Sequence, residues 1–264
     1  MSITRHDPPT LSQTLLGHRG RVEWHDHDRH QLLYPSAGVI SVATRTGTWV
    51  VPPLRAIWLP AGQPHAHLAH GPTQLCSVML PIRANPLGVT TPALLSVSPL
   101  LREVLLALTA PDPLPDDQRA RLEAVALDQL APPASRSPLT AAPCHLPEPS
   151  DDRLRAIAGI LADQPGDPRT LAQLGQAVGA SERTLSRRFR AETQMSFPQW
   201  RAQLRLHAAL VDLAAGATVA AAAHRCGFST ASAFIASFRR TFGDTPGTYR
   251  TRSGSASVRP KSPS

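Results

Sequence analysis

Apolar residues follow two different spacings along this 264-residue chain. Between residues 22 and 80 they occur in short runs rich in β-branched and aromatic side chains, separated by glycine and proline, and this pattern predicts strands joined by turns. Strands are expected at 31–34, 39–43, 48–51, 56–59 and 75–80, with turns that include 35–38 and 71–72. Short strands with regular turns are typical of an antiparallel sandwich or barrel. Residues 1–20 lack such a pattern and are expected to be loosely ordered.

From residue 98 the apolar residues recur three or four apart, which predicts helices up to residue 130. The first apolar stripe consists of Leu100, Leu101, Val104, Leu105 and Leu108. Two interpretations are open: these helices pack on the strand domain of their own chain, or they join two copies of the chain. Prolines at 132, 133, 138, 143, 147 and 149 predict a semi-rigid linker over 131–149. The Ser-, Arg- and Pro-rich tail 251–264 is expected to be disordered.

One helical pattern occurs twice between residues 170 and 250. Each copy begins with a threonine that can cap a helix, reaches a glycine that favours the left-handed conformation ending a helix, and restarts at a serine. These residues are Thr170, Gly179 and Ser181 in the first copy and Thr218, Gly227 and Ser229 in the second. Each restarted helix has apolar residues four apart, Leu185 and Phe189 and then Phe234 and Phe238, so one face packs inward and the other is free.

A longer helix is expected between the two copies, at 197–215, holding them about one DNA turn (~34 Å) apart. A short helix, a turn and a second helix with a basic free face form the unit that places a recognition helix in the major groove. Two plain helical hairpins would be the alternative, but they leave the repeated caps and basic faces unexplained.

The net positive charge is confined to the part of the chain with this repeat. Residues 1–150 hold 11 Lys+Arg and 11 Asp+Glu, whereas residues 151–264 hold 16 and 8, so the whole formal charge of +8 belongs to the second part. A basic domain attached to a neutral one is typical of a nucleic-acid-binding protein.

The repeated region resembles the DNA-binding domain of the AraC/XylS family of bacterial transcription regulators. The matching segments are Ser181-x-x-x-Leu185-Ser-Arg-Arg-Phe189, Cys226-Gly-Phe-Ser, Phe234-Ile-Ala-Ser-Phe238-Arg-Arg-Thr-Phe-Gly243 and Thr245-Pro-Gly-Thr-Tyr-Arg250. The chain departs from the family pattern at Gly175 and Ala222, where slightly larger residues are usual. Looser packing of the first helix of each unit is the expected consequence.

The resemblance also implies roles for individual residues. Arg183, Ser186 and Arg187 would face the bases, because arginine can bind guanine O6 and N7 with two hydrogen bonds. Arg188 and Arg190 would meet phosphates. In the second unit the base-facing positions are Ala231, Ser232, Ile235 and Ala236, and phosphate contacts would come from Thr230, Arg239 and Arg240. Little base-specific hydrogen bonding is therefore expected from the second unit. Arg201 and Arg205 are expected either in solvent or on DNA.

The strand region contains two histidine motifs, His25-x-His27 and Pro60-x-Gly62-x-x-His65. They resemble the two motifs of the cupin barrel, and the run 47–62 resembles the effector domain of many AraC/XylS regulators. The resemblance implies an effector pocket lined by His25, His27, Gln31, Trp58 and His65. In metal-binding cupins the three histidines would be ligands, since imidazoles two apart on a strand point the same way.

This chain has Gln31 where a metal-binding cupin would have a glutamate, and no fourth histidine is evident in the last strand. The expectation is therefore no cofactor. A divalent metal, a pocket lined by histidines and histidines without a role remain the alternatives.

These patterns predict a two-domain α+β protein. Its parts would be a cupin-like effector domain (1–97), a helical dimerisation region (98–130), the linker (131–149), a double helix-turn-helix domain (150–250) and the tail. The predicted function is a sequence-specific transcription regulator whose barrel senses a small molecule, and not an enzyme. Its partners would be double-stranded promoter DNA, the effector, a second copy of the chain and, for an activator, RNA polymerase.

A metal-dependent cupin enzyme with an appended DNA-binding module is the alternative, disfavoured by the missing glutamate and the lack of paired carboxylates among the strands. A nonspecific architectural DNA binder would leave the pocket domain unexplained. Cys76, Cys144 and Cys226 are too dispersed for a disulfide or zinc motif. With no apolar run of about 18 residues and no signal peptide, the expected location is the cytoplasm, away from membranes.

Overall fold

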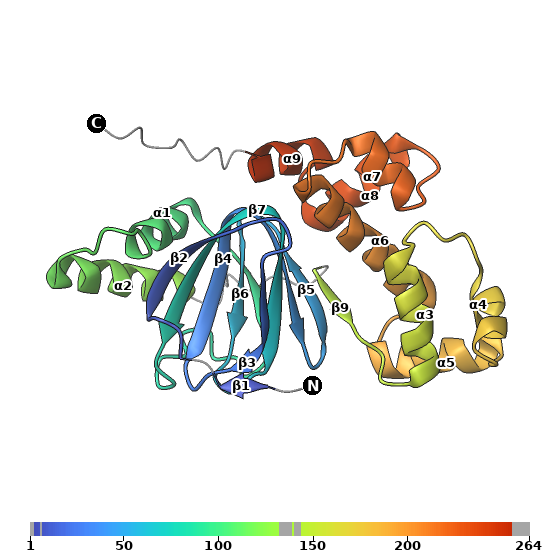
Figure 1. Ribbon diagram of the computed structural model, residues 1–264, viewed down its shortest axis with the longest axis horizontal. Helices are drawn as coiled ribbons and strands as arrows, with labels where there is room; N and C mark the ends of the chain where they lie inside the picture. Colours follow the sequence, from blue (N-terminus) through green and yellow to red (C-terminus); the bar gives the residue numbers. More distant parts are fainter. Residues whose placement is uncertain (1–2, 6, 132–138, 140–143, 255–264) are drawn as a thin grey trace. The chain divides into compact units, whose positions relative to one another are not determined.

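The computed structural model describes residues 3–5, 7–131, 139 and 144–254 (Figure 1). By internal packing the chain divides into two units. The first is built chiefly from residues 1–42 and 51–142, and the second comprises residues 43–50 and 143–250. The fold is α+β, with a sheet-rich N-terminal part and a helical C-terminal part (Figure 1).

The first unit is organised around two long strands. Its strands are β1 (Thr4–Arg5), β2 (Leu11–Leu16), β3 (Arg21–Asp26), β4 (His30–Thr44), β6 (Arg55–Leu59), β7 (His65–Leu80) and β8 (Ala93–Ser96). Strand β7 lies beside β4, and it also pairs with both β2 and β3. The β6 strand links β4 to β8, and β1 is parallel to β3. Among the described strands these pairings do not close the sheet, so the barrel is a loose one.

The two long strands correct the expected turns at 35–38 and 71–72, both of which lie inside strands. Gly38 has φ +80, and a Cβ there would lie 2.3 Å from the Thr73 hydroxyl oxygen. A glycine is required because β4 approaches the backbone of β7 this closely. The N-terminus is also more ordered than expected, since β2 pairs with β7 from Leu11 opposite Val78 onward.

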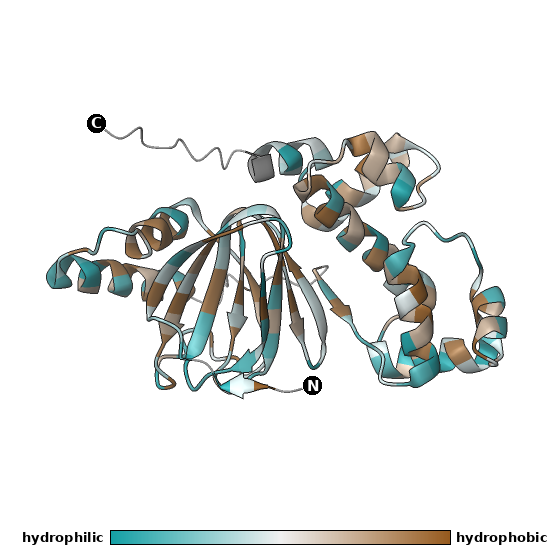
Figure 2. Ribbon diagram, in the orientation of Figure 1, coloured by the Kyte–Doolittle hydropathy of each residue, from teal (hydrophilic) through white to brown (hydrophobic). Residues whose placement is uncertain are grey.

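Helices α1 (Pro99–Leu108) and α2 (Asp116–Leu130) cover one face of the sheet of their own chain. Because side chains alternate along a strand, the neighbouring residues Leu32 of β4 and Trp58 of β6 point to this face. Both belong to the core that includes Leu101 and Leu105 of α1. Figure 2 shows α1 as largely apolar, while α2 is mostly hydrophilic along its length. The packing expected under the first interpretation is therefore present, and association of two copies through these helices stays a prediction.

The second unit contains seven helices in its described part, joined around the long helix α6 (Figure 1). They are α3 (Asp152–Asp163), α4 (Leu171–Ala177), α5 (Glu182–Thr193), α6 (Phe197–Ala214), α7 (Val219–Arg225), α8 (Ala231–Phe242) and α9 (Pro246–Gly254). Helices α4 and α5 pack near the start of α6, and α7 and α8 near its end. The first half has a core with Leu185, Phe189 and Trp200, whereas the second half is packed by Phe234, Phe238 and other aromatic rings.

The expected linker contains an ordered strand. Strand β9 (His145–Pro147) pairs antiparallel with β5 (Gly47–Val51), and the rings of Trp49 and His145 stack with centroids 4.2 Å apart. The Trp200 indole nitrogen of α6 donates to the Pro147 carbonyl at 2.8 Å. Residues 145–147 are thus part of the second unit, while most of 132–143 lies outside the described residues.

The tail also differs from expectation at its start, because α9 continues to Gly254; residues 255–264 lie outside the described part. Among the helices that the structure describes, none has the length and apolar character needed to cross a membrane.

Candidate functional site

Two helix-turn-helix units are present, and local side chains set their boundaries. Thr170 caps α4 in a reciprocal pair with Gln173, and Ser181 caps α5. Thr218 caps α7 in the second unit. The turn glycines Gly179 and Gly227 have φ +64 and +71, the left-handed conformation that glycine adopts without strain. These features of the repeat are confirmed.

One boundary differs from the prediction: α8 is capped by Thr230, not by Ser229. The second turn therefore has one residue more between its glycine and its cap than the first turn, which has Ala180 alone.

Helix α5 presents three arginines on one exposed face. Leu185 and Phe189 are fully buried, which fixes the orientation of the helix. Arg183, Arg187 and Arg190 are exposed and, at spacings of four and three, lie along one stripe. Within the described part of the chain, no ion pair or side-chain hydrogen bond holds these guanidinium groups. Ser186 is also exposed, toward the edge of this stripe.

Arg188 is held within the protein. It forms an ion pair with Asp151, the residue that caps α3. On the same side of α5, Glu192 accepts hydrogen bonds from the backbone nitrogens of Ser150 and Asp151 at 2.7 and 3.1 Å. This side of α5 is held against the start of α3, and the contact between Arg188 and a phosphate stays a prediction.

Helix α8 has the same buried face and a different outer face. Phe234 and Phe238 are fully buried, as Leu185 and Phe189 are in α5. In this register Ser232, Ile235 and Ala236 take the places of Arg183, Ser186 and Arg187, and Arg239 takes the place of Arg190. Ile235 is 37% exposed, and the outward residues Ala231, Ser232, Ala236, Arg239 and Arg240 are exposed as well. The outer face of α8 is therefore largely uncharged in its first two turns.

Arg201 and Arg205 of α6 stabilise a loop instead of facing solvent or DNA. Arg201 donates to the Arg169 carbonyl at 2.6 Å. Arg205 donates to the carbonyls of Pro165 and Asp167 at 2.9 and 3.2 Å. Burial lowers the pKa of Arg201. Both expected roles are wrong, because these side chains provide the donors for backbone carbonyls ahead of α4.

The expected looser packing at Gly175 is also wrong. A Cβ at this position would lie 2.5 Å from the Ala180 carbonyl oxygen and 3.0 Å from the Leu185 side chain. Glycine allows α4 and the turn to come closer than any larger residue would permit. Ala222 in the second unit is fully buried.

In the sheet-rich N-terminal part of the chain, three histidine rings meet at one place. His25 of β3, His27 just after it and His65 at the start of β7 are 5%, 2% and 0% exposed. Each contributes a ring nitrogen to a group in which all such nitrogens lie within 4.8 Å of one another. Strands β3 and β7 pair with His25 opposite His65, which brings the two motifs together.

Hydrogen bonds fix how these rings face. The Nδ1 atoms of His25, His27 and His65 lie 2.8, 2.6 and 2.8 Å from backbone carbonyls two residues away. The Gln31 amide oxygen lies 3.2 Å from Nε2 of His27 and 3.1 Å from Nε2 of His65. The Gln31 amide nitrogen donates to the Ser77 hydroxyl at 2.9 Å. Ring nitrogens of this kind are suitable ligands for a divalent metal, so the residues fit such an ion.

Burial disfavours the charged form of two histidines on β7. It lowers the pKa of His65 to about 3, and the neighbouring histidines lower it further. His67, two residues along β7, has its pKa lowered to about 4, also mainly by burial. Sequence reasoning missed His67, although its two-residue spacing from His65 repeats that of His25 and His27 and places it on the same side of the strand.

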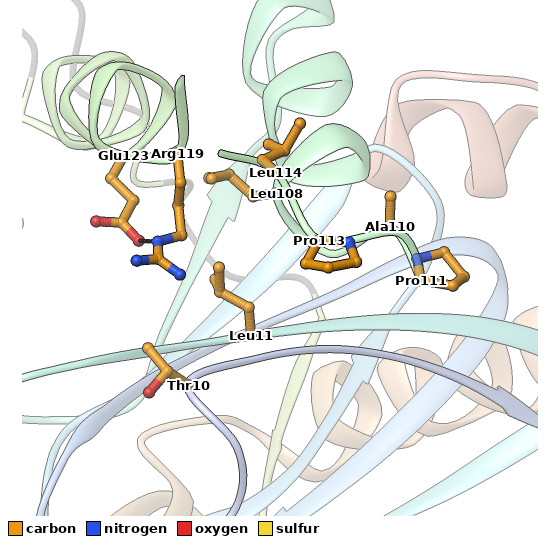
Figure 3. A pocket seen from close by; sticks show the side chains of 9 residues that line it. All are labelled: Thr10, Leu11, Leu108, Ala110, Pro111, Pro113, Leu114, Arg119 and Glu123. Carbon is orange, nitrogen blue, oxygen red and sulfur yellow. Dashed lines mark ion pairs between the residues drawn. The ribbon is translucent and has the colours of Figure 1, made fainter. Parts of the chain in front are cut away.

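A cavity of about 190 Å³ adjoins the cluster. Its polar end has His25, Gln31, His67 and Ser77, and its apolar wall includes Leu33. A second cavity of about 560 Å³ lies between β2 and the α1–α2 connection (Figure 3). Arg119 and Glu123 of α2 line this second cavity, with their charged atoms 3.9 Å apart.

Known protein families match the sheet-rich part and the helical part of the chain separately. Residues 15–87 match the AraC-like ligand binding domain, and residues 174–252 match a helix-turn-helix domain. The HTH-type transcriptional regulator NimR of Escherichia coli (strain K12) is 34% identical over 233 residues, which span 86% of this chain and 82% of NimR. The chain belongs to the AraC/XylS family of transcription regulators.

Two further similar proteins each match less than half of this AraC/XylS protein. The HTH-type transcriptional regulator RipA of Corynebacterium glutamicum is 36% identical over 120 residues, 44% of this chain and 36% of RipA. A crystal structure of a DNA-binding transcriptional dual regulator from Escherichia coli K-12 is 25% identical, covers 40% of this chain and 96% of its own, and has a TM-score of 0.37.

One predicted pocket residue of this AraC/XylS regulator lies elsewhere. Trp58 is fully buried in the core between the sheet and α1, where its ring stacks on His30. Its register partner is Leu32, whereas Gln31 points to the opposite face of β4. Trp58 therefore cannot line the histidine cavity, because successive side chains on a strand alternate between faces.

Proposed function

We propose that this regulator reads DNA sequence mainly through α5. Arg183 and Arg187 would bind base edges in the major groove, with Ser186 beside them, and Arg190 would contact a phosphate. The observation that carries the proposal is the exposed stripe of three arginines whose guanidinium groups no described residue engages. A protein surface that leaves guanidinium groups free in a line is suited to an anionic duplex.

The second unit would position the protein on DNA. Arg239 and Arg240 would contact phosphates, and so would Thr230 at the start of α8. Ala231, Ser232, Ile235 and Ala236 offer methyl groups and one hydroxyl, which give little hydrogen-bonded discrimination among base pairs. With 18 residues, α6 is about 27 Å long, which supports placement of the two units in successive major grooves.

A small molecule in the histidine cavity would alter operator binding. The support is the match of residues 15–87 to a ligand-binding domain and the presence of buried polar groups at one end of an apolar cavity. The cavity is smaller than the roughly 300–1,000 Å³ usual for ligand sites, so the effector would be compact. The effector could change the free energy of DNA binding by no more than the difference between its binding free energies to the two states of the protein, the one that binds DNA and the one that does not.

The remaining partners follow from the same proposal. Two copies would associate through α1 and α2, where Leu100 is 53% exposed, and an activator would also contact RNA polymerase. The protein would act in the cytoplasm, where a bacterial chromosome lies, and it would not be an enzyme. Light scattering of the wild type and Leu100→Glu tests the dimer: the wild type should have the mass of two chains, and the variant should shift toward one.

Genomic DNA captured by the purified protein, once sequenced, provides the operator for the decisive comparison. Arg187→Ala should weaken operator binding by about 1–3 kcal/mol and relax the preference at one base pair. Arg240→Ala should weaken operator and random DNA alike. A common, sequence-selective defect in both variants would refute this division of roles.

A further inference from the structure

The described lining of the 190 Å³ cavity contains no aspartate, glutamate, lysine or arginine, and it includes the buried ring of His67. We propose that this cavity binds an uncharged molecule about the size of one small ring, and that His67 recognises it by hydrogen bonding. The inference rests on the proposed function, since this molecule would be the effector of the same site. It adds the chemical class of the effector and the residue that selects it.

The register of the strands determines which side chains reach the cavity. On β4, Gln31 and Leu33 line it, whereas Leu32 between them belongs to the core that α1 covers. On β7, Ser77 lines it, whereas Cys76 belongs to that core. Because side chains alternate along a strand, the cavity lies on the face of the sheet that α1 does not cover.

His67 is a buried polar side chain with unused hydrogen-bonding capacity. It is 8% exposed, and its buried Nδ1 atom has no hydrogen-bond partner among the residues that the structure describes. The rings of His27 and His65, in contrast, already lie at hydrogen-bond distance from backbone carbonyls and from the Gln31 amide. An unpaired polar group in a protein interior costs free energy, so the His67 ring is suited to pair with a molecule in the cavity.

The polar end of the cavity can both donate and accept hydrogen bonds. A neutral imidazole has one N–H donor and one nitrogen acceptor in either tautomer. The Ser77 hydroxyl accepts from the Gln31 amide nitrogen at 2.9 Å and retains capacity for a second contact. A ligand group that also donates and accepts, such as an amide or a hydroxyl, matches this end.

The same lining disfavours an ionic ligand. A carboxylate or an ammonium group would leave water and find no arginine, lysine, aspartate or glutamate among the described side chains that line the cavity. Transfer of an unpaired ion from water into a protein interior costs far more than transfer of an amide or a hydroxyl. Sites for carboxylates usually provide an arginine for this reason.

The volume and the apolar wall define the rest of the ligand. A cavity of about 150 Å³ lined by apolar side chains accommodates benzene, so about 190 Å³ is enough for one small ring with a polar substituent. Leu33 and Leu75, which are 1% and 4% exposed, provide apolar surface for the ring. Thr14 also lines the cavity and is exposed, so it lies on the side that reaches solvent.

The test uses three probes of nearly the same planar shape that differ in charge: benzamide is neutral, benzoate is an anion and benzamidinium is a cation. Ligand-observed NMR titrations of the full-length wild type measure their affinities without DNA. Benzamide should saturate one site per chain, and each ion should bind at least roughly tenfold more weakly.

Two substitutions of β7 histidines test the role of His67. His67→Phe keeps a ring at this position and removes its hydrogen bonds, so the affinity for benzamide should fall roughly 3- to 10-fold. His70→Phe is the matched control, because His70 is another partly buried histidine of β7 and its ring contacts Ser41. Its affinity for benzamide should equal that of the wild type.

Thr14→Lys should change the charge preference in the opposite direction. Thr14 pairs with Leu75 across β2 and β7, and a lysine ammonium at this exposed position would reach the solvent side of the cavity. The affinity for benzoate should rise roughly fivefold or more, while binding of benzamide stays nearly the same. Misfolding cannot imitate this gain.

Equal affinities of the wild type for benzamide and benzoate, or tighter binding of either ion, would refute the uncharged class. Unweakened binding of benzamide by folded His67→Phe would refute the role of His67. A cavity that holds water alone predicts no saturable binding of benzamide to the folded wild type, and this result overturns the whole inference.

Operator binding in a mobility-shift assay is recorded on the same samples. Failure of the probe predictions with operator binding intact would refute this inference alone. Absence of operator binding by the wild type would refute the proposed function, whatever the probes show.

Discussion

The two helix-turn-helix units of this protein share a scaffold and differ in the side chains they expose. Both have capped helices, a left-handed glycine and two fully buried side chains four apart in the second helix. The exposed face of α5 has Arg183 and Arg187 where α8 has Ser232 and Ala236. The buried positions thus determine the fold that the two units share, and we propose that a few outward side chains decide which unit reads bases.

The interiors of the two helix-turn-helix units are packed in different ways. The first unit has Gly175 in α4, where no Cβ fits, and the corresponding residue of α7 is Ala223, which is buried without conflict. The second unit relies on stacked aromatic rings, with Phe238 4.7 Å from Phe242 and 5.2 Å from Tyr249 between ring centroids. The close backbone packing is therefore found in the first unit, whose helix α5 we propose to read the DNA sequence.

The largest expected effect is loss of the two arginines that we propose to read bases. The double variant Arg183→Ala/Arg187→Ala should lose about 2–6 kcal/mol of operator binding, since each bidentate contact contributes about 1–3 kcal/mol. The matched change in α8 is Ser232→Ala, because Ala236 is already alanine, and it should change the affinity by less than about 0.5 kcal/mol. Fluorescence anisotropy at fixed salt measures both. Equal losses would show that the two helices read DNA equally.

Next in size is the effect of packing in α4. Gly175→Ala should lower the free energy of unfolding by about 1–3 kcal/mol, because the added methyl group overlaps the Ala180 carbonyl. Ala223→Gly, at the equivalent place in α7, should cost about 1–2 kcal/mol through lower helix propensity and the loss of one buried methyl group. Chemical denaturation of residues 1–264 followed by tryptophan fluorescence is suitable, since Trp200 reports on the first half. A stabilised Gly175→Ala protein would contradict the close packing.

Replacing Asp167 and Asp212 by asparagine should lower the free energy of unfolding by different amounts. Hydrogen bonds from Arg169 at 2.6–2.9 Å hold the pKa of the buried Asp167 carboxyl below its usual value, so the charged form is stabilised in the folded state. Burial raises the pKa of Asp212, and Arg225 offsets this only in part. Asp167→Asn should cost about 1–2 kcal/mol at pH 7, whereas Asp212→Asn should cost less than about 1 kcal/mol.

The stabilisation by the Asp167 carboxylate should depend on pH in a definite direction. Because the folded pKa of Asp167 is depressed, its contribution is complete above the usual carboxyl pKa and is lost as the pH falls toward the folded value. The difference in unfolding free energy between wild type and Asp167→Asn should therefore shrink between pH 5 and pH 3. A constant difference over this interval would exclude the charged hydrogen bonds as its cause.

The smallest effects are expected from the phosphate contacts of α8. Arg239→Ala and Arg240→Ala should each reduce the slope of log K against log salt by about 1, with similar losses on operator and random DNA. Affinities measured at four or five salt concentrations give this slope. An unchanged slope in both variants would remove these residues from the interface.

Interactions between neighbouring residues made much of the helical C-terminal part predictable from the sequence. Caps, turn glycines and apolar spacings act within a few residues, so the expected helix at 197–215 appears as Phe197–Ala214 and the repeat appears in both copies. The choice of Thr230 over Ser229 as the cap of α8 was missed, because both residues have a suitable hydroxyl and only the packing of the longer turn selects one.

Contacts between distant residues account for the remaining differences. The sequence does not show that Arg188 meets Asp151 or that Arg205 meets the carbonyl of Pro165, since each pair is separated by about 40 residues. Trp58 was misplaced because its face of the strand depends on which side α1 covers. The histidine cluster was expected from the resemblance to the cupin motifs, and the two-residue spacing of His65 and His67 would have identified His67 as well.

The most direct test of the central claim is selection of bound duplexes from a random double-stranded DNA library, followed by sequencing. The account predicts one strongly specified block of base pairs and a weakly specified block about one helical turn away. In the Arg183→Ala/Arg187→Ala variant the strong block should lose its preferences while the weak block stays as it was. Two equally specified blocks in the wild type, or loss of the weak block in the variant with the strong one preserved, would contradict the claim that α5 reads the sequence.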